Sequence, residues 1–445
     1  MQKHFDSPFE SSPHGFLNID SDEVYCKSLS GQCNVYSFHV IQTISDADTI
    51  EEWILIVTLS GKIFRFVIDD AIDHRSDDSY FLKFACDEFD LRNDFPSHYI
   101  DLEVTSSCIH KVDTGQIYLF LACVDNRSHL VDASRNPNVG NVGSISAPGI
   151  IFIVRIAPPW KPLTPLATVV RTLTTSYPPC LAAIFPVRRP GSSTDDHVLF
   201  VSGTDRSMHG YRIEMTSANS GGLSPQRGAQ ISTCECFLGE TLTEFDAMFR
   251  RGKPLPGTIL QLDVRYVESE QFDRVTSIGF DTGLVNVCLA DATRNDLVTG
   301  PIDYHFDTPI SALQWFSWRP TVSPSVTDCQ LSLLVCPTIG PASLLSIIDD
   351  PSCNDSAIVF PRSDQFDCIT CAESIIISTS EGTNTNYILL GTFGGKVLVY
   401  ALDNNRNLAS LKRVHSFLSP VMKIRQFGHK YVAVLLTYTL MIFKC

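Results

Sequence analysis

One unit recurs along nearly the whole of this sequence, and few folds can hold so many copies of it. Each copy is a strongly apolar run, a tight turn rich in glycine or aspartate, and a second apolar run. This pattern is typical of a β-hairpin that is covered on both faces, whereas helical periodicity is nearly absent from the chain. Seven copies occupy residues 53–68, 117–157, 198–213, 275–290, 331–348, 387–402 and 431–445.

Further strands flank these hairpins. One precedes each hairpin, as at residues 34–41 and 309–318, and a weaker, more polar one follows several of them, as at 408–418. Four antiparallel strands per unit and seven units predict an all-β fold, a seven-bladed β-propeller. Length alone would suggest about three domains at ~150 residues each. The repeat instead predicts a single propeller domain over residues 1–445.

Closure of the ring needs one more strand. The seventh hairpin runs to Cys445, so the last blade has no outer strand of its own. An unpaired edge there would invite aggregation. We therefore expect an N-terminal strand, supplied by residues 15–27, to complete the last blade. Residues 1–14 are polar and rich in proline and charge, and we expect them to be disordered.

Long loops are the places where a propeller normally carries its function. The inserts are at about 125–148, 214–230, 239–257 and 375–386. Loops that join the first to the second strand and the third to the fourth share one face of a blade. This puts 214–230 and 375–386 on one face and 125–148 on the other.

The insert at 239–257 carries the one helical pattern. Leu238, Leu242, Phe245 and Phe249 recur at spacings of three and four residues, which predicts a short helix at roughly 240–250. A helix that packs on a sheet is one interpretation, and a helix that binds a partner is the other.

Composition excludes several classes of partner and compartment. Lysine plus arginine number 34 against 49 for aspartate plus glutamate, a net charge of −15, which disfavours nucleic acid and anionic membrane surfaces. Cysteines number 15, an odd count, and no secretory signal precedes them, so we expect a reducing cytoplasm. The longest apolar run, residues 431–443, is shorter than the ~20 residues of a membrane-spanning helix.

A search for chemical motifs yields little. Asp281-Thr-Gly283 matches the aspartic-protease triplet, but that enzyme needs two copies, and the same tripeptide suits a hairpin turn. Cys368 and Cys371 have the spacing of a zinc or redox pair, yet side chains at i and i+3 of a strand diverge. Phosphate-binding loops and hydrolase motifs are missing. We therefore expect a protein that is not an enzyme, with no catalytic residues, no cofactor and no metal site.

One segment has a composition that no structural role fully requires, Pro361-Arg-Ser-Asp-Gln-Phe-Asp367 at the junction into the sixth unit. The structural interpretation is a turn whose Phe366 fills the core while Asp364 and Asp367 cap backbone amides. The functional interpretation is a contact with a protein partner. The candidate interaction residues are Asp364, Gln365, Phe366 and Asp367.

Several segments, in order, resemble the kaptin family, that of the propeller subunit of the KICSTOR complex. The most specific is Phe360-Pro-Arg-Ser-Asp-Gln-Phe-Asp367, because the hairpin motifs by themselves occur in any propeller. The similar segments are residues 33–36, 57–66, 200–205, 278–287, 309–311, 360–367 and 390–400. The resemblance runs from about residue 33 to the end of the chain.

The resemblance implies a scaffold without chemistry of its own. The family's complex recruits GATOR1, a GTPase-activating complex, to the lysosome and thereby restrains target-of-rapamycin (TORC1) signalling when nutrients are scarce. A partner is then a second propeller with FG-GAP repeats, among further KICSTOR-like subunits, and actin has also been linked to the family. The implied location is cytoplasmic, with recruitment to the lysosomal surface but no insertion into the membrane.

Two other classes stay open. The first is a propeller adaptor of another complex, of trafficking, ubiquitin-ligase or cytoskeletal type. The second is an enzyme with its site at the central channel, which would need convergent acid, base or metal-binding groups on the inner strands.

Overall fold

The computed structural model describes most of the strands and many of the turns of this chain. The described residues are 25–28, 35–44, 50–69, 83–91, 102–112, 115–125, 149–158, 165–187, 196–216, 230–236, 242–248, 255–267, 272–318, 330–347, 358–362, 364, 366–378, 384–403, 408–427 and 431–444. The other residues lie outside this account.

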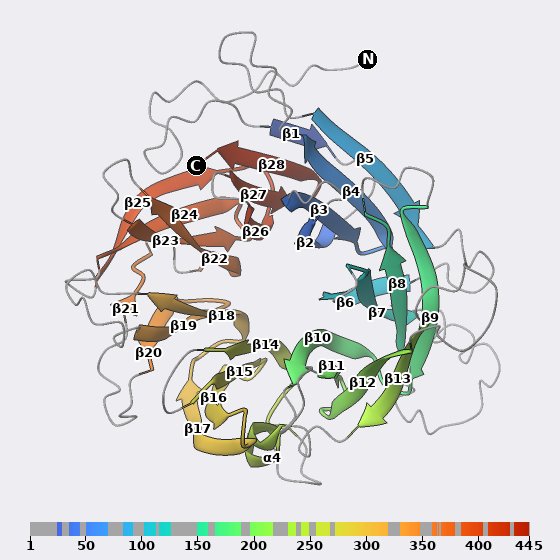
Figure 1. The fold of residues 1–445 in the computed structure, drawn as a ribbon. Coiled ribbons are helices and arrows are strands. Elements are labelled where there is room, and N and C mark those ends of the chain that lie inside the picture. The colour runs from blue at the N-terminus through green and yellow to red at the C-terminus, as the bar shows by residue number, and fades with distance from the viewer. Residues whose placement is uncertain are drawn as a thin grey trace, which may run out of the picture.

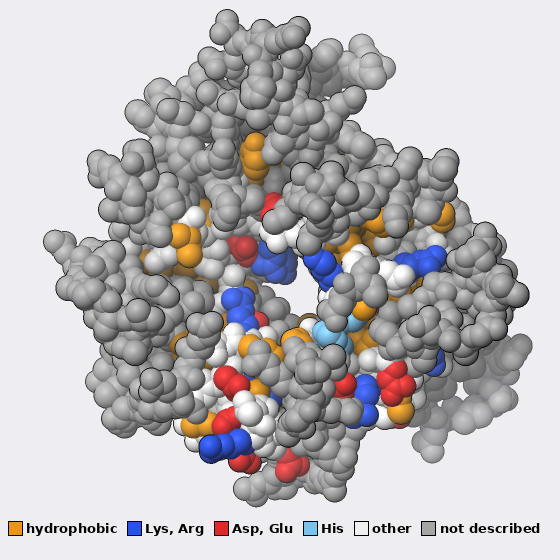
Figure 2. All heavy atoms as spheres, viewed as in Figure 1, with side chains coloured by type: hydrophobic (Ala, Val, Ile, Leu, Met, Phe, Trp, Pro, Cys, Tyr) orange, Lys and Arg blue, Asp and Glu red, His pale blue; other side chains and the backbone are white. Residues whose placement is uncertain are grey.

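Seven antiparallel sheets of four strands each are arranged around a central axis (Figure 1), so the predicted seven-bladed β-propeller is confirmed. The first strand of each blade lies nearest the axis, and a space-filling view shows an opening there (Figure 2). We number the blades 1 to 7 in chain order of their first strands.

The strands of blades 1 to 4 are as follows. Blade 1 consists of β2 (Val35–Ile44), β3 (Ile50–Thr58), β4 (Lys62–Asp69) and β5 (Lys83–Asp90), and blade 2 of β6 (Leu102–Lys111), β7 (Ile117–Asp125), β8 (Gly149–Ile156) and β9 (Ala167–Thr175). Blade 3 consists of β10 (Pro179–Val187), β11 (Asp196–Gly203), β12 (Met208–Thr216) and β13 (Gln230–Cys236), and blade 4 of β14 (Ile259–Tyr266), β15 (Arg274–Phe280), β16 (Leu284–Asp291) and β17 (Asp296–His305).

The strands of blades 5 to 7 complete the ring. Blade 5 consists of β18 (Ile310–Trp318), β19 (Gln330–Pro337), β20 (Ser343–Ser346) and β21 (Ile358–Val359), and blade 6 of β22 (Ile369–Ser378), β23 (Asn384–Thr392), β24 (Lys396–Asp403) and β25 (Leu408–Ser416). Blade 7 consists of β26 (Val421–Phe427), β27 (Tyr431–Leu436), β28 (Thr439–Lys444) and β1 (Tyr25–Ser28).

An N-terminal strand closes the last blade, as predicted. β1 pairs antiparallel with β28, with Tyr25 opposite Ile442 and Ser28 opposite Thr439. It lies at the C-terminal end of the segment that we expected to supply it, and the rest of that segment and residues 1–14 fall outside the described residues. The two ends of the chain thus share one sheet, which leaves no blade short of a strand.

Burial falls from the inner to the outer strands of a blade. Every residue of β15 is buried, whereas β25 contains only exposed and half-buried residues. The core therefore lies between the inner strands of neighbouring blades, and the outer strands form the rim of the disc. This is the gradient expected when the inner strands are covered on both faces and the outer strands on one.

The same irregularity interrupts the first strand of all seven blades. Pairing with the second strand shifts after the first residue pair in six blades, as between Val35 and Ser37 in blade 1, and after the third pair in blade 2, between Val104 and Ser106. A bulge of this kind bends a strand and increases its twist. The repeated bulge therefore sets how each blade enters the ring.

The turns between second and third strands are also alike. Gly61, Gly283 and Gly395 occupy equivalent positions with φ of +81°, +81° and +78°. A Cβ on Gly283 would lie 2.1 Å from the carbonyl oxygen of Phe306, so the close approach of the next connection also requires glycine there. Asp281-Thr-Gly283 is therefore a hairpin turn, as one of its two interpretations predicted.

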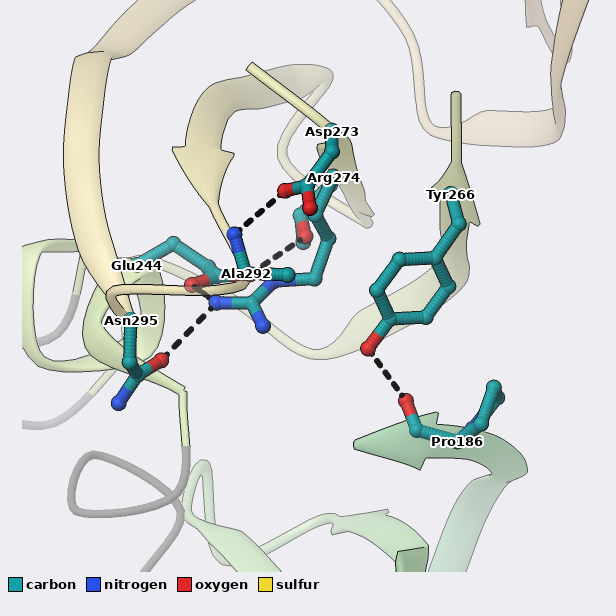
Figure 3. A network of polar contacts seen from close by, with 8 residues as sticks. Pro186, Glu244, Tyr266, Asp273, Arg274, Ala292 and Asn295 are labelled. Atoms are coloured by element: carbon teal, nitrogen blue, oxygen red, sulfur yellow. Dashed lines mark hydrogen bonds and ion pairs between the residues drawn. The ribbon is translucent and has the colours of Figure 1, made fainter. Parts of the chain in front are cut away.

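The predicted short helix is present as α4 (Thr243–Met248). Phe245 is buried and packs against Phe185 and Phe200 of blade 3, with ring centroids 6.1 and 5.9 Å away. Glu244 pairs with Arg274 of blade 4 (Figure 3). The helix thus packs on sheets, which was the first of its two interpretations, and it joins two neighbouring blades. The side chains of Leu238 and Phe249 are not among those described.

Candidate interaction surface

The segment singled out in the sequence lies where it was expected, between β21 and β22. Side-chain hydrogen bonds hold its backbone in place. Arg362 is buried and donates hydrogen bonds to the carbonyl oxygens of Gly340, at 2.9 Å, and of Asp367. The Tyr400 hydroxyl donates to the carbonyl oxygen of Pro361 at 2.7 Å. The turn is therefore fixed to blades 5 and 6 by side chains that solvent barely reaches.

Both carboxylates bind the neighbouring hairpin turn. Asp367 Oδ1 accepts a hydrogen bond from the backbone N–H of Gly394 at 2.7 Å. Asp364 Oδ2 lies 3.2 Å from the Lys396 ammonium, and that bond lowers the pKa of the Asp364 carboxyl, with a smaller contribution from the amides of Phe366 and Asp367. Asp364 therefore remains a carboxylate at neutral pH on an exposed part of the surface.

Phe366 does not fill the core, so this part of the structural interpretation is wrong. Its side chain is 87% exposed. The reason is that Phe360, six residues earlier, already occupies the core position, where it is fully buried edge-to-face against Tyr400 at 5.2 Å. The turn then carries Phe366 outward on the surface. Gln365 lies outside the described residues.

Four other large apolar side chains are exposed in loops at the same end of neighbouring blades. Leu418, the most exposed, has 91% of its side chain in solvent. We refer to the five residues together as the apolar loop patch, which consists of Ile339, Phe366, Phe393, Leu418 and Tyr438. They belong to blades 5, 6 and 7, which are consecutive in the ring.

Strand register explains why these loops share a face. In an antiparallel blade, the start of the first strand lies beside the end of the second, as Ile369 lies opposite Thr392 in blade 6. Each second-to-third turn therefore lies next to the connection that enters its blade. Three backbone hydrogen bonds join such neighbouring loops: from Ile369 N to Thr338 O (2.9 Å), from Phe393 N to Cys368 O (2.8 Å) and from Phe417 N to Gly395 O (2.7 Å).

The remaining large apolar side chains that the structure shows as exposed are placed differently. They lie on strands, mostly outer ones: Val170, Val298, Val359, Ile376, Leu408, Leu411 and Val414. Single apolar residues on a rim are ordinary in folded proteins, whereas a group gathered on one face is typical of a binding surface. The apolar loop patch is thus the candidate binding surface.

Sequence reasoning found one member of the patch and missed the others. Phe393 stands at a turn position where blade 4 has Asp281, and Leu418 stands two residues before a proline that begins the next blade. A large apolar residue inside a polar turn was the signal. It is visible only after the repeats are aligned turn by turn.

The described residues show few groups suited to catalysis or metal binding at this surface. No group of three or more His, Cys, Asp and Glu in the described part of the chain could hold a metal ion. Cys371 is buried, and burial raises the pKa of its thiol. Likewise, no helix within the described ranges is long and apolar enough to cross a membrane. The surface offers apolar area, carboxylates and one lysine, which suit binding.

Comparisons with known proteins give one family. A family model described as KICSTOR complex protein kaptin matches residues 182–430, more than half of the chain. No relative was found among curated proteins. Among solved structures, BBS1N in complex with ARL6DN is similar with a TM-score of 0.48 and 10% identity, covering 94% of this chain and 95% of that chain. The structure of U3-55K has a TM-score of 0.46 and 10% identity, covering 94% and 98%.

Proposed function

This chain belongs to the kaptin family, and on that premise we propose that it is a non-catalytic scaffold that docks to protein partners through the apolar loop patch. The matched family residues include four of the five members of the patch, all except Tyr438. A propeller can serve as a scaffold because its rigid ring offers two faces and a rim without needing any reaction.

The observation that carries the proposal is the exposure of Phe366. Moving a phenylalanine out of water is favourable, by roughly 25 cal/mol for each Å² of apolar surface buried. Here the residue keeps 87% of its surface in solvent, in a loop at the same end of the blades as the exposed Leu418 and Phe393. Burial of these side chains against a partner would contribute the apolar centre of an interface, and aromatic residues are common among the residues that dominate binding.

Charge suggests what surrounds that centre on the partner. Asp364 is exposed at the edge of the patch, and the chain as a whole carries a net charge of −15. A partner surface with an apolar centre and basic flanks would complement this charge. Asp364 forms the acidic side of the proposed contact, whereas Asp367 holds the neighbouring turn through the Gly394 N–H.

Membership of the family supports a finer proposal. We propose a subunit of a KICSTOR-like complex that docks to a second, FG-GAP-type propeller, recruits GATOR1 to the lysosomal surface and restrains TORC1 signalling in response to nutrients. The alternative is a propeller adaptor of another assembly, of trafficking, ubiquitin-ligase or actin-cytoskeleton type.

Affinity purification of the full chain, followed by mass spectrometry, separates these two proposals. Recovery of a second propeller subunit together with GATOR1 components supports the KICSTOR-like function. Recovery of a coat, cullin or actin component without a second propeller would overturn it in favour of the alternative.

A further inference from the structure

A second group of polar side chains gathers on the inner strands, away from the apolar loop patch. Lys and Arg side chains, with acidic and His side chains among them, stand around the central opening (Figure 2). Four neighbouring inner strands, β22, β26, β2 and β6, carry a set of polar residues that are linked to one another by direct contacts or by charge. We call them the channel group: His39, Ser107, Glu373, Lys423 and Arg425.

Direct contacts join neighbouring strands on each of the two sides of the group. His39 Nε2 lies 2.8 Å from Ser107 Oγ, and Ser107 Oγ lies 2.5 Å from Ser37 Oγ. On the other side, an Arg425 Nη1–Glu373 Oε2 ion pair bridges β26 and β22. Lys423 shares a side of β26 with Arg425, because residues two apart on a strand point the same way.

Charge inside the group is unbalanced. Both carboxylate oxygens of Glu373 already have a partner. Oε2 binds Arg425, and Oε1 accepts a hydrogen bond from the backbone N–H of Gln426 at 3.3 Å. Lys423 has no hydrogen bond or ion pair with any other described residue of the chain. Among the described residues, the group therefore holds two cations, Lys423 and Arg425, and one carboxylate, Glu373, which bonds Arg425 and attracts Lys423 only from a distance.

Such a lysine lowers the stability of the fold. Burial, together with the nearby Arg425, lowers the pKa of Lys423 to about 8, which means that the folded state disfavours its charge. A chain with 49 acidic residues has placed no second carboxylate beside it among the described residues. Groups that are kept at the expense of stability are frequent at functional sites.

We propose that the channel group binds a phosphate-type oxyanion, with Lys423 as its counter-charge. A lysine ammonium is a point charge that binds phosphate well, whereas a planar carboxylate suits the arginine fork that Glu373 already occupies. The charge of Lys423 contributes to the lowered pKa of His39, and His39 contacts the Ser107 hydroxyl, so polar groups capable of hydrogen bonding stand near this lysine.

Catalysis by the same residues fits the structure less well. A serine that contacts a histidine could suggest an activated nucleophile. However, burial and the two nearby cations lower the pKa of His39 to about 3, so its imidazole would be a poor general base at neutral pH. The channel group is thus suited to holding an anion.

Equilibrium dialysis of the full chain against radiolabelled orthophosphate at pH 7 tests this proposal. We expect one saturable phosphate for each chain, and a loss of affinity of at least about tenfold in Lys423→Met. Lys412→Met is the matched control, because Lys412 is exposed on the outer strand β25, and it should bind as the wild type does. Absence of saturable binding, or equal binding by Lys423→Met, would overturn the proposal.

A second arm identifies the source of the phosphate. The same three proteins are sedimented with phosphatidylcholine vesicles that carry, or lack, phosphatidylinositol 4-phosphate. Sedimentation that requires both the phospholipid and Lys423 assigns the site to a lipid headgroup. Phosphate binding in dialysis without such sedimentation assigns it to a soluble phosphate compound.

Discussion

Arg274 and Glu244 form an ion pair inside the fold in which neither side chain has any exposed surface, with Nε 2.6 Å from Oε1. A second hydrogen bond joins Nη2 to Oε2 at 2.7 Å (Figure 3). The Thr276 hydroxyl donates a hydrogen bond to Glu244 Oε1, and Asn295 Oδ1 accepts one from Arg274 Nη2, at 3.1 Å each. Because Phe245 of the same helix packs on blade 3, this pair joins blades 3 and 4.

Removal of one partner should therefore be severe. Glu244→Ala leaves Arg274 charged and buried without its counter-charge, which costs about 3–5 kcal/mol in comparable buried pairs. Urea unfolding of the full chain at pH 7 measures the change. The double variant Glu244→Met with Arg274→Met is the control, and it should recover most of the stability because no charge is left unpaired. A loss below about 1 kcal/mol for Glu244→Ala would show that the pair does not join the blades.

Deletion of residues 1–28 should leave a chain that aggregates or unfolds at a lower temperature. Without β1, the backbone groups of β28 that pair with Tyr25–Ser28 face solvent as an open sheet edge. Size-exclusion chromatography and thermal unfolding measure the effect. Deletion of residues 1–14 alone keeps β1 and should behave like the full chain. A monomeric 29–445 fragment with an unchanged Tm would refute closure of the ring by β1.

Lys423→Met should raise the free energy of unfolding at pH 7 by roughly 2 kcal/mol. The folded pKa of about 8 lies below the ordinary 10.5, so the penalty of the charged lysine is fully present below pH 8. It disappears as the pH rises from about 8 to 10.5. The advantage of the variant over the wild type should shrink across that window, and an advantage that is constant with pH would contradict the assignment.

His39 should make the fold sensitive to acid. Its folded pKa of about 3 lies below the ordinary 6.5, so the unfolded chain binds a proton that the folded chain does not. Stability from this group is complete above pH 6.5 and is lost as the pH falls toward 3. Denaturant unfolding of His39→Asn should therefore show a weaker decline than the wild type between pH 6.5 and 4. Parallel declines would mean that other groups carry the acid sensitivity.

Local pattern was enough to predict the ring, because its signals lie close together in the sequence. Apolar hairpins and glycine turns such as Gly283 and Gly395 are read within about 15 residues. The strand at Tyr25–Ser28 followed from counting, since the last hairpin lacked a fourth strand. Each of these inferences needs no knowledge of which residues meet across the fold.

Features that depend on distant partners escaped prediction. Whether Phe360 or Phe366 fills the core is decided by Tyr400, on another strand. Arg274 meets Glu244 across 30 residues of chain, and neither has a local signature. The bulge in each first strand exists only relative to its pairing strand. The apolar loop patch likewise required the ring, because its members are far apart in sequence.

The apolar loop patch itself is tested by substitutions that should leave stability alone. Phe366→Ser combined with Leu418→Ser changes two side chains that are 87% and 91% exposed, so the free energy of unfolding should move by no more than about 0.5 kcal/mol per site. Leu408→Ser is the matched control, an exposed apolar residue on the outer strand β25 that lies outside the patch. Thermal unfolding should give similar Tm values for all four proteins: the wild type, the double variant, the control and Phe366→Ser alone.

The most direct test of docking through this surface is quantitative affinity purification of the wild-type chain, the double variant and the Leu408→Ser control from the same cells. We predict that the partners recovered with the wild type fall at least about tenfold with the double variant and stay at wild-type levels with the control. Recovery of the same partners in undiminished amounts with Phe366→Ser and Leu418→Ser combined would contradict the account.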